Sequence, residues 1–148
     1  MGYGLAVCKN PGGTNGLLPV FQELRKDYKV KLLANGNAVT QLFNAREAFE
    51  FYPTVEEVLA NYPNPDFLIT SMCDSDDGGM GRELIPPLRG HCPTFGLQDY
   101  WEATLSVEWA DPKYRPDYIF VNDRVGAEIV LKAWPYFTNS RILQTGFL

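Results

Sequence analysis

The sequence predicts an α/β fold of three layers, a Rossmann-like domain with a mainly parallel sheet of about six to seven strands and helices on both faces. Three observations lead to it. Short apolar runs recur along the chain, helix-like segments lie between them, and small polar residues follow most runs. Apolar strands that alternate with helices are typical of a parallel sheet covered on each side. The 148 residues suit one such unit, so residues 1–148 are expected to form a single domain.

The first strand is predicted at residues 3–9 and ends in the sequence Asn-Pro-Gly-Gly. Apolar residues then recur at helical spacing over residues 17–24, with Asn15 as the expected N-cap and Pro19 in the first turn. Because this strand is apolar and opens the alternation, we expect it to be central in the sheet.

A second strand, residues 30–34, leads into Asn35 and Gly36. An Asn-Gly pair can form a hairpin turn, but helical spacing continues over residues 39–43, so a strand-to-helix junction is predicted. Thr54, three residues before a glutamate, is the expected cap of a further helix. The remaining strands are predicted at residues 49–52, 66–72, 94–97, 118–121 and 142–144, and the remaining helices at 81–88, ended by two prolines, and 127–134.

Composition excludes several classes of protein. The net charge of -5 argues against non-specific nucleic-acid binding, which needs a basic face. No apolar run reaches the roughly 20 residues of a membrane span, and Met1 is followed by no signal segment. Three cysteines without C-x-x-C spacing argue against a disulfide framework and a zinc site. We therefore expect a cytoplasmic protein without a nucleic-acid partner or membrane span, and no motif calls for a cofactor.

Residues suited to ligand binding follow nearly every predicted strand, and ligands of parallel sheets bind outside the carboxyl ends of the strands. The candidates are Gly12, Gly13, Thr14, Asn15, Gly16, Asn35, Asp74, Gln98 and Asn122. The same residue types also form turns and helix caps, so a purely structural role stays open for each. The glycine run is no P-loop, because no lysine follows its last glycine, and its spacing differs from G-x-G-x-x-G. We expect a bulky residue at Gly13 to abolish ligand binding and to leave the melting temperature nearly unchanged.

Carboxylates, one histidine and the cysteines are the other candidates for chemistry. Asp74, Asp76 and Asp77 would suit magnesium, but a solvated acidic turn explains them as well, and no metal site is predicted. His91 precedes a strand and so lies at the wrong edge for the cleft. Cys8 is expected to be a buried small hydrophobe, as is Cys73.

Residues 100–116 form a long aromatic segment between two predicted strands. Segments of this length in a compact domain tend to be functional lids. Trp101 could stack on a ligand ring, or it could cover the sheet edge as part of a hydrophobic lid.

Two stretches carry a resemblance to the amino-terminal half of enzymes with the GT-B architecture. "NPGGTNGLLPVFQELRKDYKVKLLANG" resembles the opening of that half, with its strand, glycine run, helix and second strand. "PDYIFVNDRVGAEIVLKAWPYFTNSRILQTGFL" resembles its end, where a strand leads into a Thr-Gly-x-Pro-like turn. Relatives of this kind include UDP-N-acetylglucosamine 2-epimerases and the glycosyltransferase that adds N-acetylglucosamine during peptidoglycan synthesis.

The resemblance implies an acceptor or sugar site at residues 12–16, with Asp99 and Asp123 as positional candidates for catalytic residues. It also implies a nucleotide-sugar ligand held mainly by a carboxyl-terminal half, so a missing domain or a partner chain would complete the site. Two hypotheses remain open. The chain is a module of a sugar-transferring or sugar-nucleotide-epimerising enzyme, incomplete for catalysis alone, or a flavodoxin-like binding or regulatory domain without catalysis.

Overall fold

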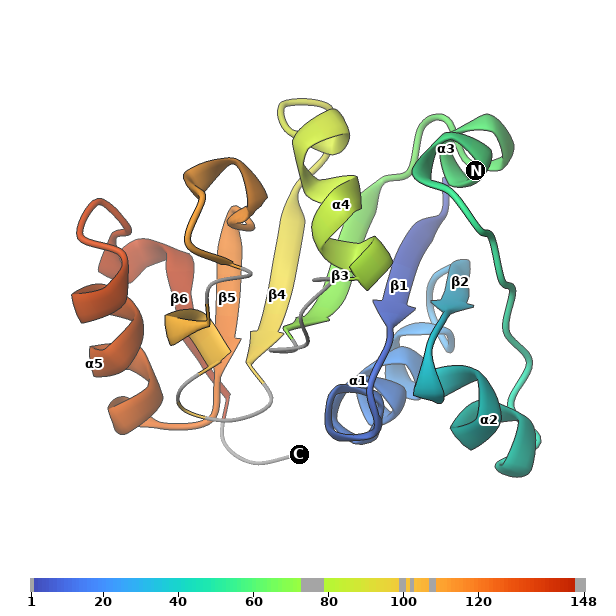
Figure 1. The fold of residues 1–148 in the computed structure, drawn as a ribbon, viewed down its shortest axis with the longest axis horizontal. Coiled ribbons are helices and arrows are strands. Elements are labelled where there is room, and N and C mark those ends of the chain that lie inside the picture. Colours follow the sequence, from blue (N-terminus) through green and yellow to red (C-terminus); the bar gives the residue numbers. More distant parts are fainter. Residues whose placement is uncertain (1, 73–78, 99–100, 102, 107–108, 146–148) are drawn as a thin grey trace.

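The computed structural model describes residues 2–72, 79–98, 101, 103–106 and 109–145 (Figure 1). They build a six-stranded sheet in the order β2-β1-β3-β4-β5-β6, in which every neighbouring pair is parallel. The strands are β1 (Gly4–Cys8), β2 (Val30–Ala34), β3 (Phe67–Met72), β4 (Thr94–Gln98), β5 (Tyr118–Val121) and β6 (Ile142–Gln144). The predicted Rossmann-like α/β fold is therefore confirmed.

Helices cover both faces of the sheet (Figure 1). They are α1 (Pro11–Leu24), α2 (Asn37–Asn44), α3 (Val55–Asn61), α4 (Gly79–Leu88) and α5 (Arg124–Ala133). One buried cluster joins α1 and α2 to one face, and a second joins α3, α4 and α5 to the other. Right-handed crossovers explain why the helices divide between the two faces. β2 is added to the sheet on one side of β1, whereas β4, β5 and β6 are added in the opposite direction, so their connections lie on the other face. Within the described part of the chain, no helix is both long and apolar enough to cross a bilayer.

The strand predicted at residues 49–52 is wrong. Only Glu50 pairs there, as a single bridge to Leu33 at the outer edge of β2. Two backbone hydrogen bonds form this bridge: the Ala34 N–H donates to the Glu50 carbonyl at 3.0 Å, and the Glu50 N–H donates to the Leu32 carbonyl at 2.9 Å. Pro53 follows within three residues and cannot donate to a ladder, which limits the pairing to this one position.

Helix α1 begins at Pro11, four residues before the predicted N-cap Asn15. Asn10 is the N-cap, because its side-chain Oδ1 accepts the N–H of Gly13 at 2.8 Å, and Pro11 opens the helix. Pro19 therefore lies inside the helix rather than in its first turn. The backbone bond that it removes would go to the carbonyl of Asn15, an exposed residue that water can reach. The glycine run is thus the first turns of a helix and not a loop.

Two further helix ends were also predicted from the sequence. Thr54 caps α3 as expected, with its Oγ1 accepting the N–H of Glu57 at 3.2 Å. The prolines Pro86 and Pro87 were expected to end α4, and the helix ends directly after them at Leu88, the predicted bound. Neither proline can donate to the carbonyl four residues earlier, that of Arg82 or of Glu83, so the helix does not propagate past them.

Two glycines let helices approach β3 from opposite faces. A Cβ on Gly13 of α1 would lie 2.6 Å from Ser71 Cβ, and a Cβ on Gly81 of α4 would lie 1.7 Å from Thr70 Oγ1. Thr70 and Ser71 are consecutive in β3, so their side chains point to opposite faces of the sheet. Real Cβ atoms do not approach other atoms this closely, so any side chain at either position would displace a helix.

We expect Gly81→Ala and Gly13→Ala each to lower the free energy of unfolding by about 1–3 kcal/mol, because the added methyl group overpacks the contact with β3. Urea unfolding of the purified variants measures the change. This differs from the expectation that substitution at Gly13 leaves the melting temperature nearly unchanged, because Gly13 is buried against Ser71.

Gly16→Ala is the matched control in the same helix, since a Cβ at Gly16 makes only an ordinary 3.4 Å contact with Leu97. It should be neutral or stabilise the protein by up to about 1 kcal/mol through helix propensity. Equal losses for Gly13 and Gly16 would contradict the close-packing argument.

The described parts of residues 100–116 pack on the sheet rather than standing away from it. They include the short 3₁₀ turns η1 (Ala103–Leu105) and η3 (Pro112–Tyr114). Trp109 is fully buried in the cluster that contains α4 and α5, and the Arg82 guanidinium lies 4.3 Å from the centre of the Tyr114 ring. These residues cover the sheet between β4 and β5, where a crossover helix would otherwise lie.

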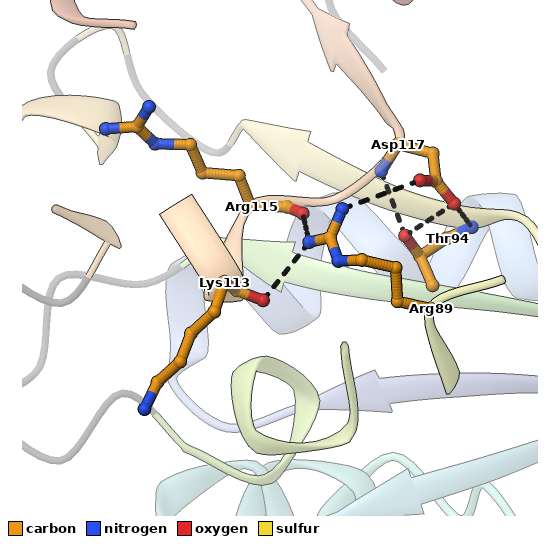
Figure 2. Close-up of polar contacts among 5 residues, drawn as sticks. All are labelled: Arg89, Thr94, Lys113, Arg115 and Asp117. Carbon is orange, nitrogen blue, oxygen red and sulfur yellow. Dashed lines mark hydrogen bonds and ion pairs between the residues drawn. The ribbon is translucent and has the colours of Figure 1, made fainter. Parts of the chain in front are cut away.

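A polar network fixes the amino ends of β4 and β5 (Figure 2). The Thr94 N–H donates to Asp117 Oδ2 at 2.9 Å, and the Asp117 N–H donates to Thr94 Oγ1 at 2.9 Å. Arg89 lies beside them, 3.8 Å from Asp117 Oδ1, and donates to the carbonyls of Lys113 and Arg115. The network satisfies backbone N–H and carbonyl groups at the amino edge of the sheet.

Candidate functional site

The topological switch point of the sheet lies between β1 and β3. β1 was predicted to be central; it is interior, with β2 on one side and β3 on the other, but it lies second from the edge and the central strands are β3 and β4. Ligands of open α/β sheets bind outside the carboxyl ends of the strands at such a point. Here it is formed by the residues after Cys8 of β1 and by Ser71 near the end of β3.

Lys9 lies at this point and was not among the residues predicted from the sequence. A Cβ on Gly36 would lie 3.2 Å from Lys9 Cγ, and one on Gly79 would lie 2.7 Å from Lys9 Cδ. Both glycines have positive φ, of 58° and 76°, so the lysine stem passes between two positions that favour glycine. The signal in the sequence was a lysine three residues before Gly12, whereas the lysine of a P-loop follows its last glycine.

The predicted residues of the glycine run divide into two groups. Gly13 and Thr14 are buried, and Thr14 Oγ1 donates to the carbonyl of Asn10 at 2.7 Å. Gly12 and Asn15 are exposed on the outer side of the same turns, where Asn15 Oδ1 accepts a hydrogen bond from Gln41 of α2 at 2.6 Å. Gly16 is partly buried. Packing therefore explains the inner residues, and a contact with a ligand is open only to the outer ones.

Other predicted residues lie at the carboxyl ends of β2, β4 and β5. Asn35 donates its backbone N–H to the carbonyl of Cys8 at 3.3 Å, and its side-chain Oδ1 is buried without a hydrogen-bond partner. Gln98 is 2% exposed; its Nε2 donates to the carbonyl of Trp101 at 3.3 Å, while its Oε1 also lacks a partner. Asn122 directly follows β5 and is partly buried. Polar groups thus follow three strands of one edge, as predicted.

Asp123 has two structural functions. Its Oδ1 accepts the N–H of Gly126 at 2.9 Å, which makes it the N-cap of α5. Both of its carboxylate oxygens accept the indole N–H of Trp101, each at 3.1 Å. These contacts account for an aspartate at this position without chemistry, and its catalytic candidacy stays a prediction.

The remaining acidic candidates, Asp74, Asp76, Asp77 and Asp99, lie outside the described residues. Among the residues that the structure does describe, no cluster of three or more His, Cys, Asp and Glu side chains could hold a metal ion. His91 is exposed and precedes β4, at the amino edge of the sheet, as expected.

Two hollows lined by described residues lie away from the predicted edge. One of about 420 Å³ lies at the amino edge, beside Tyr3, Tyr28 and Asp66. The other, of about 360 Å³, is apolar and lies on the α1 face between Leu24 and the stacked rings of Phe95 and Phe120, whose centres are 5.6 Å apart. Neither includes a residue predicted to bind the ligand, so the cleft at the carboxyl edge stays a prediction.

The two described cysteines, Cys8 and Cys92, are buried, and their surroundings do not favour the thiolate. Burial raises the pKa of the Cys8 thiol to about 11, and it also raises the pKa of Cys92. A thiol with a raised pKa is a poor nucleophile, because the thiolate is the reactive form. Cys8 is therefore a small buried hydrophobe, as predicted, and Cys73 lies outside the described residues.

We expect Cys8 and Cys92 to resist a thiol reagent such as Ellman's reagent at pH 8 in the folded protein and to react fully in guanidinium. Their burial and raised pKa both oppose attack. The Cys73→Ser variant isolates these two thiols for the measurement. Rapid native reaction of that variant would contradict the assignment.

Comparison with known proteins supports the fold. No family model and no curated protein matches the sequence. Among solved structures, a UDP-GlcNAc 2-epimerase from Neisseria meningitidis, bound to UDP-GlcNAc, is similar with a TM-score of 0.69 and 13% identity. The similarity covers 98% of this chain and 47% of the epimerase chain, so the chain spans about half of that enzyme. The fold implied by the GT-B resemblance is thus the fold observed.

Proposed function

We propose that this chain is the acceptor-side domain of a sugar-transferring or sugar-nucleotide-epimerising enzyme. It binds a sugar or nucleotide sugar at the carboxyl edge of its sheet and is incomplete for catalysis alone. The observation that carries the proposal is the likeness, over 98% of this chain, to about half of an epimerase that binds UDP-GlcNAc. Lys9 supports it from within the chain, because it places a cationic side chain at the switch point, where an anionic ligand would bind.

The incompleteness follows from what the chemistry needs. Epimerisation or sugar transfer requires the reacting groups to be held in near-attack geometry and shielded from water. The described edge would supply one wall, made of the start of α1, the end of β4 and the residues after β2 and β5. A second wall, from another domain or a partner chain, would complete the closure.

A second candidate function is a binding or regulatory domain without catalysis. The contacts of Asp123 favour it, because its carboxylate caps α5 and holds the indole of Trp101. The same edge would then bind a sugar or nucleotide without a reacting group in place. Ligand binding is common to both functions, and turnover after addition of the second domain separates them.

We expect UDP-GlcNAc to bind the isolated chain weakly and to shift the amide NMR signals of Gly12, Asn15 and Asn122 more than that of His91 at the opposite edge. Lys9→Ala should weaken binding about tenfold, the loss of one charge-assisted contact. Lys132→Ala, an exposed lysine in the last turn of α5, is the matched control. Equal weakening by both variants would show a general charge effect and contradict a site at Lys9.

We expect the isolated chain not to turn over UDP-GlcNAc, because one open wall leaves the reacting groups hydrated. Incubation with and without magnesium, followed by chromatography for released UDP and for the epimer, measures this directly. Steady multiple-turnover formation of either product would contradict the proposal that the site is incomplete. It would also direct attention to Asp74, Asp76 and Asp77 as metal ligands.

A further inference from the structure

Trp101 differs from the other two tryptophans of the chain. Trp109 and Trp134 are 0% and 1% exposed, whereas Trp101 is 45% exposed. It stands three residues after Gln98, the last residue of β4, and so lies at the carboxyl edge where the ligand site is proposed. An aromatic ring this large is ordinarily buried for its apolar area.

The exposed ring is held in place at both ends. Its indole N–H donates to both carboxylate oxygens of Asp123 at 3.1 Å, and Asp123 is itself tied to the N–H of Gly126 in α5. Its backbone carbonyl accepts Nε2 of the buried Gln98 at 3.3 Å. Trp101 therefore links the end of β4 to the start of α5, and its orientation is fixed although nearly half of it faces solvent.

Two residues close to Trp101 in the sequence carry buried oxygens without partners. Gln98 Oε1 and Thr104 Oγ1 have no hydrogen-bond partner, and both residues are only 2% exposed. Gly126 makes room for the first, since a Cβ there would lie 2.4 Å from Gln98 Oε1. Unsatisfied buried oxygens are uncommon in folded proteins and are expected where water or a ligand supplies the missing donor.

We propose that Trp101 is a platform on which the pyranose ring of the ligand stacks, at the carboxyl edge of β4 and β5. The inference rests on the proposed function for the presence of a sugar. The C–H face of a pyranose fits the electron-rich face of an indole. Because hydrogen bonds already hold the ring in one orientation, little side-chain entropy is lost when the ligand stacks on it.

Tryptophan fluorescence tests the platform, because Trp101 is the accessible emitter of the three. Acrylamide quenching is measured alone and with saturating UDP-GlcNAc, N-acetylglucosamine or UDP. UDP-GlcNAc and N-acetylglucosamine should lower the quenching constant about twofold, and UDP alone should leave it unchanged. Calorimetry then gives the affinity of the variants for UDP-GlcNAc.

Trp101→Ala should weaken UDP-GlcNAc binding about tenfold through loss of the stacked ring. Trp101→Phe, which keeps an aromatic face, should bind within about threefold of the unmodified chain. Tyr136→Ala removes an aromatic ring that is 95% exposed elsewhere on the surface, and it should bind normally. The phenylalanine variant and the quenching data decide the question if the alanine variant does not fold.

Each outcome is decisive. Binding of UDP-GlcNAc with unchanged quenching and with normal affinity of the Trp101 variants would overturn the platform and leave the proposed function intact. Protection by UDP as strong as that by UDP-GlcNAc would overturn the assignment of the sugar, because the base would then cover the indole. Absence of binding by all three probes would overturn the proposed function and the platform with it.

Discussion

Strand β3 carries a helix pressed against each of its faces, and the rest of the structure depends on this double contact. Thr70 meets Gly81 of α4 on one side and Ser71 meets Gly13 of α1 on the other. A helix normally packs on a sheet through side chains, which keep the two backbones apart. Glycine removes this spacer on both sides, so the first turns of both helices come close to the carboxyl end of β3, beside the switch point.

The order in which the strands are added determines which helices cover each face of the sheet. From β3 to β6 each strand lies further in one direction, and right-handed crossovers place the connecting segments on the face of α4 and α5. The opposite face of β4 and β5 therefore receives only α1. This explains why the stacked rings of Phe95 and Phe120 line a hollow there. The two faces therefore differ in their helices, whereas all six parallel strands end at the same carboxyl edge.

The sequence predicted the elements whose signals are local. The apolar runs at residues 118–121 and 142–144 are the observed bounds of β5 and β6, and Thr54 caps α3 as expected. It did not predict that the glycine run is helical, because glycine disfavours helices and the compensating contact with Ser71 comes from a distant strand. The bond between Trp101 and Asp123 joins residues 22 apart, so no local pattern could show it. The places of these candidate residues at strand ends were thus predictable and their hydrogen-bond partners were not.

The sequence of the glycine run allowed two interpretations, a ligand site and a purely structural turn, and both remain compatible with its place in α1. A helix turn has an inner and an outer side, and successive residues alternate between them at 100° steps. Gly13 and Thr14 face inward, where close packing and a backbone bond to Asn10 require small residues. Gly12 and Asn15 face outward at the helix N-terminus, where a ligand could approach without a side chain in its way. If the proposed function holds, stability and binding fall on different residues of the same turn, and we expect substitution of Gly12 to affect binding without affecting stability.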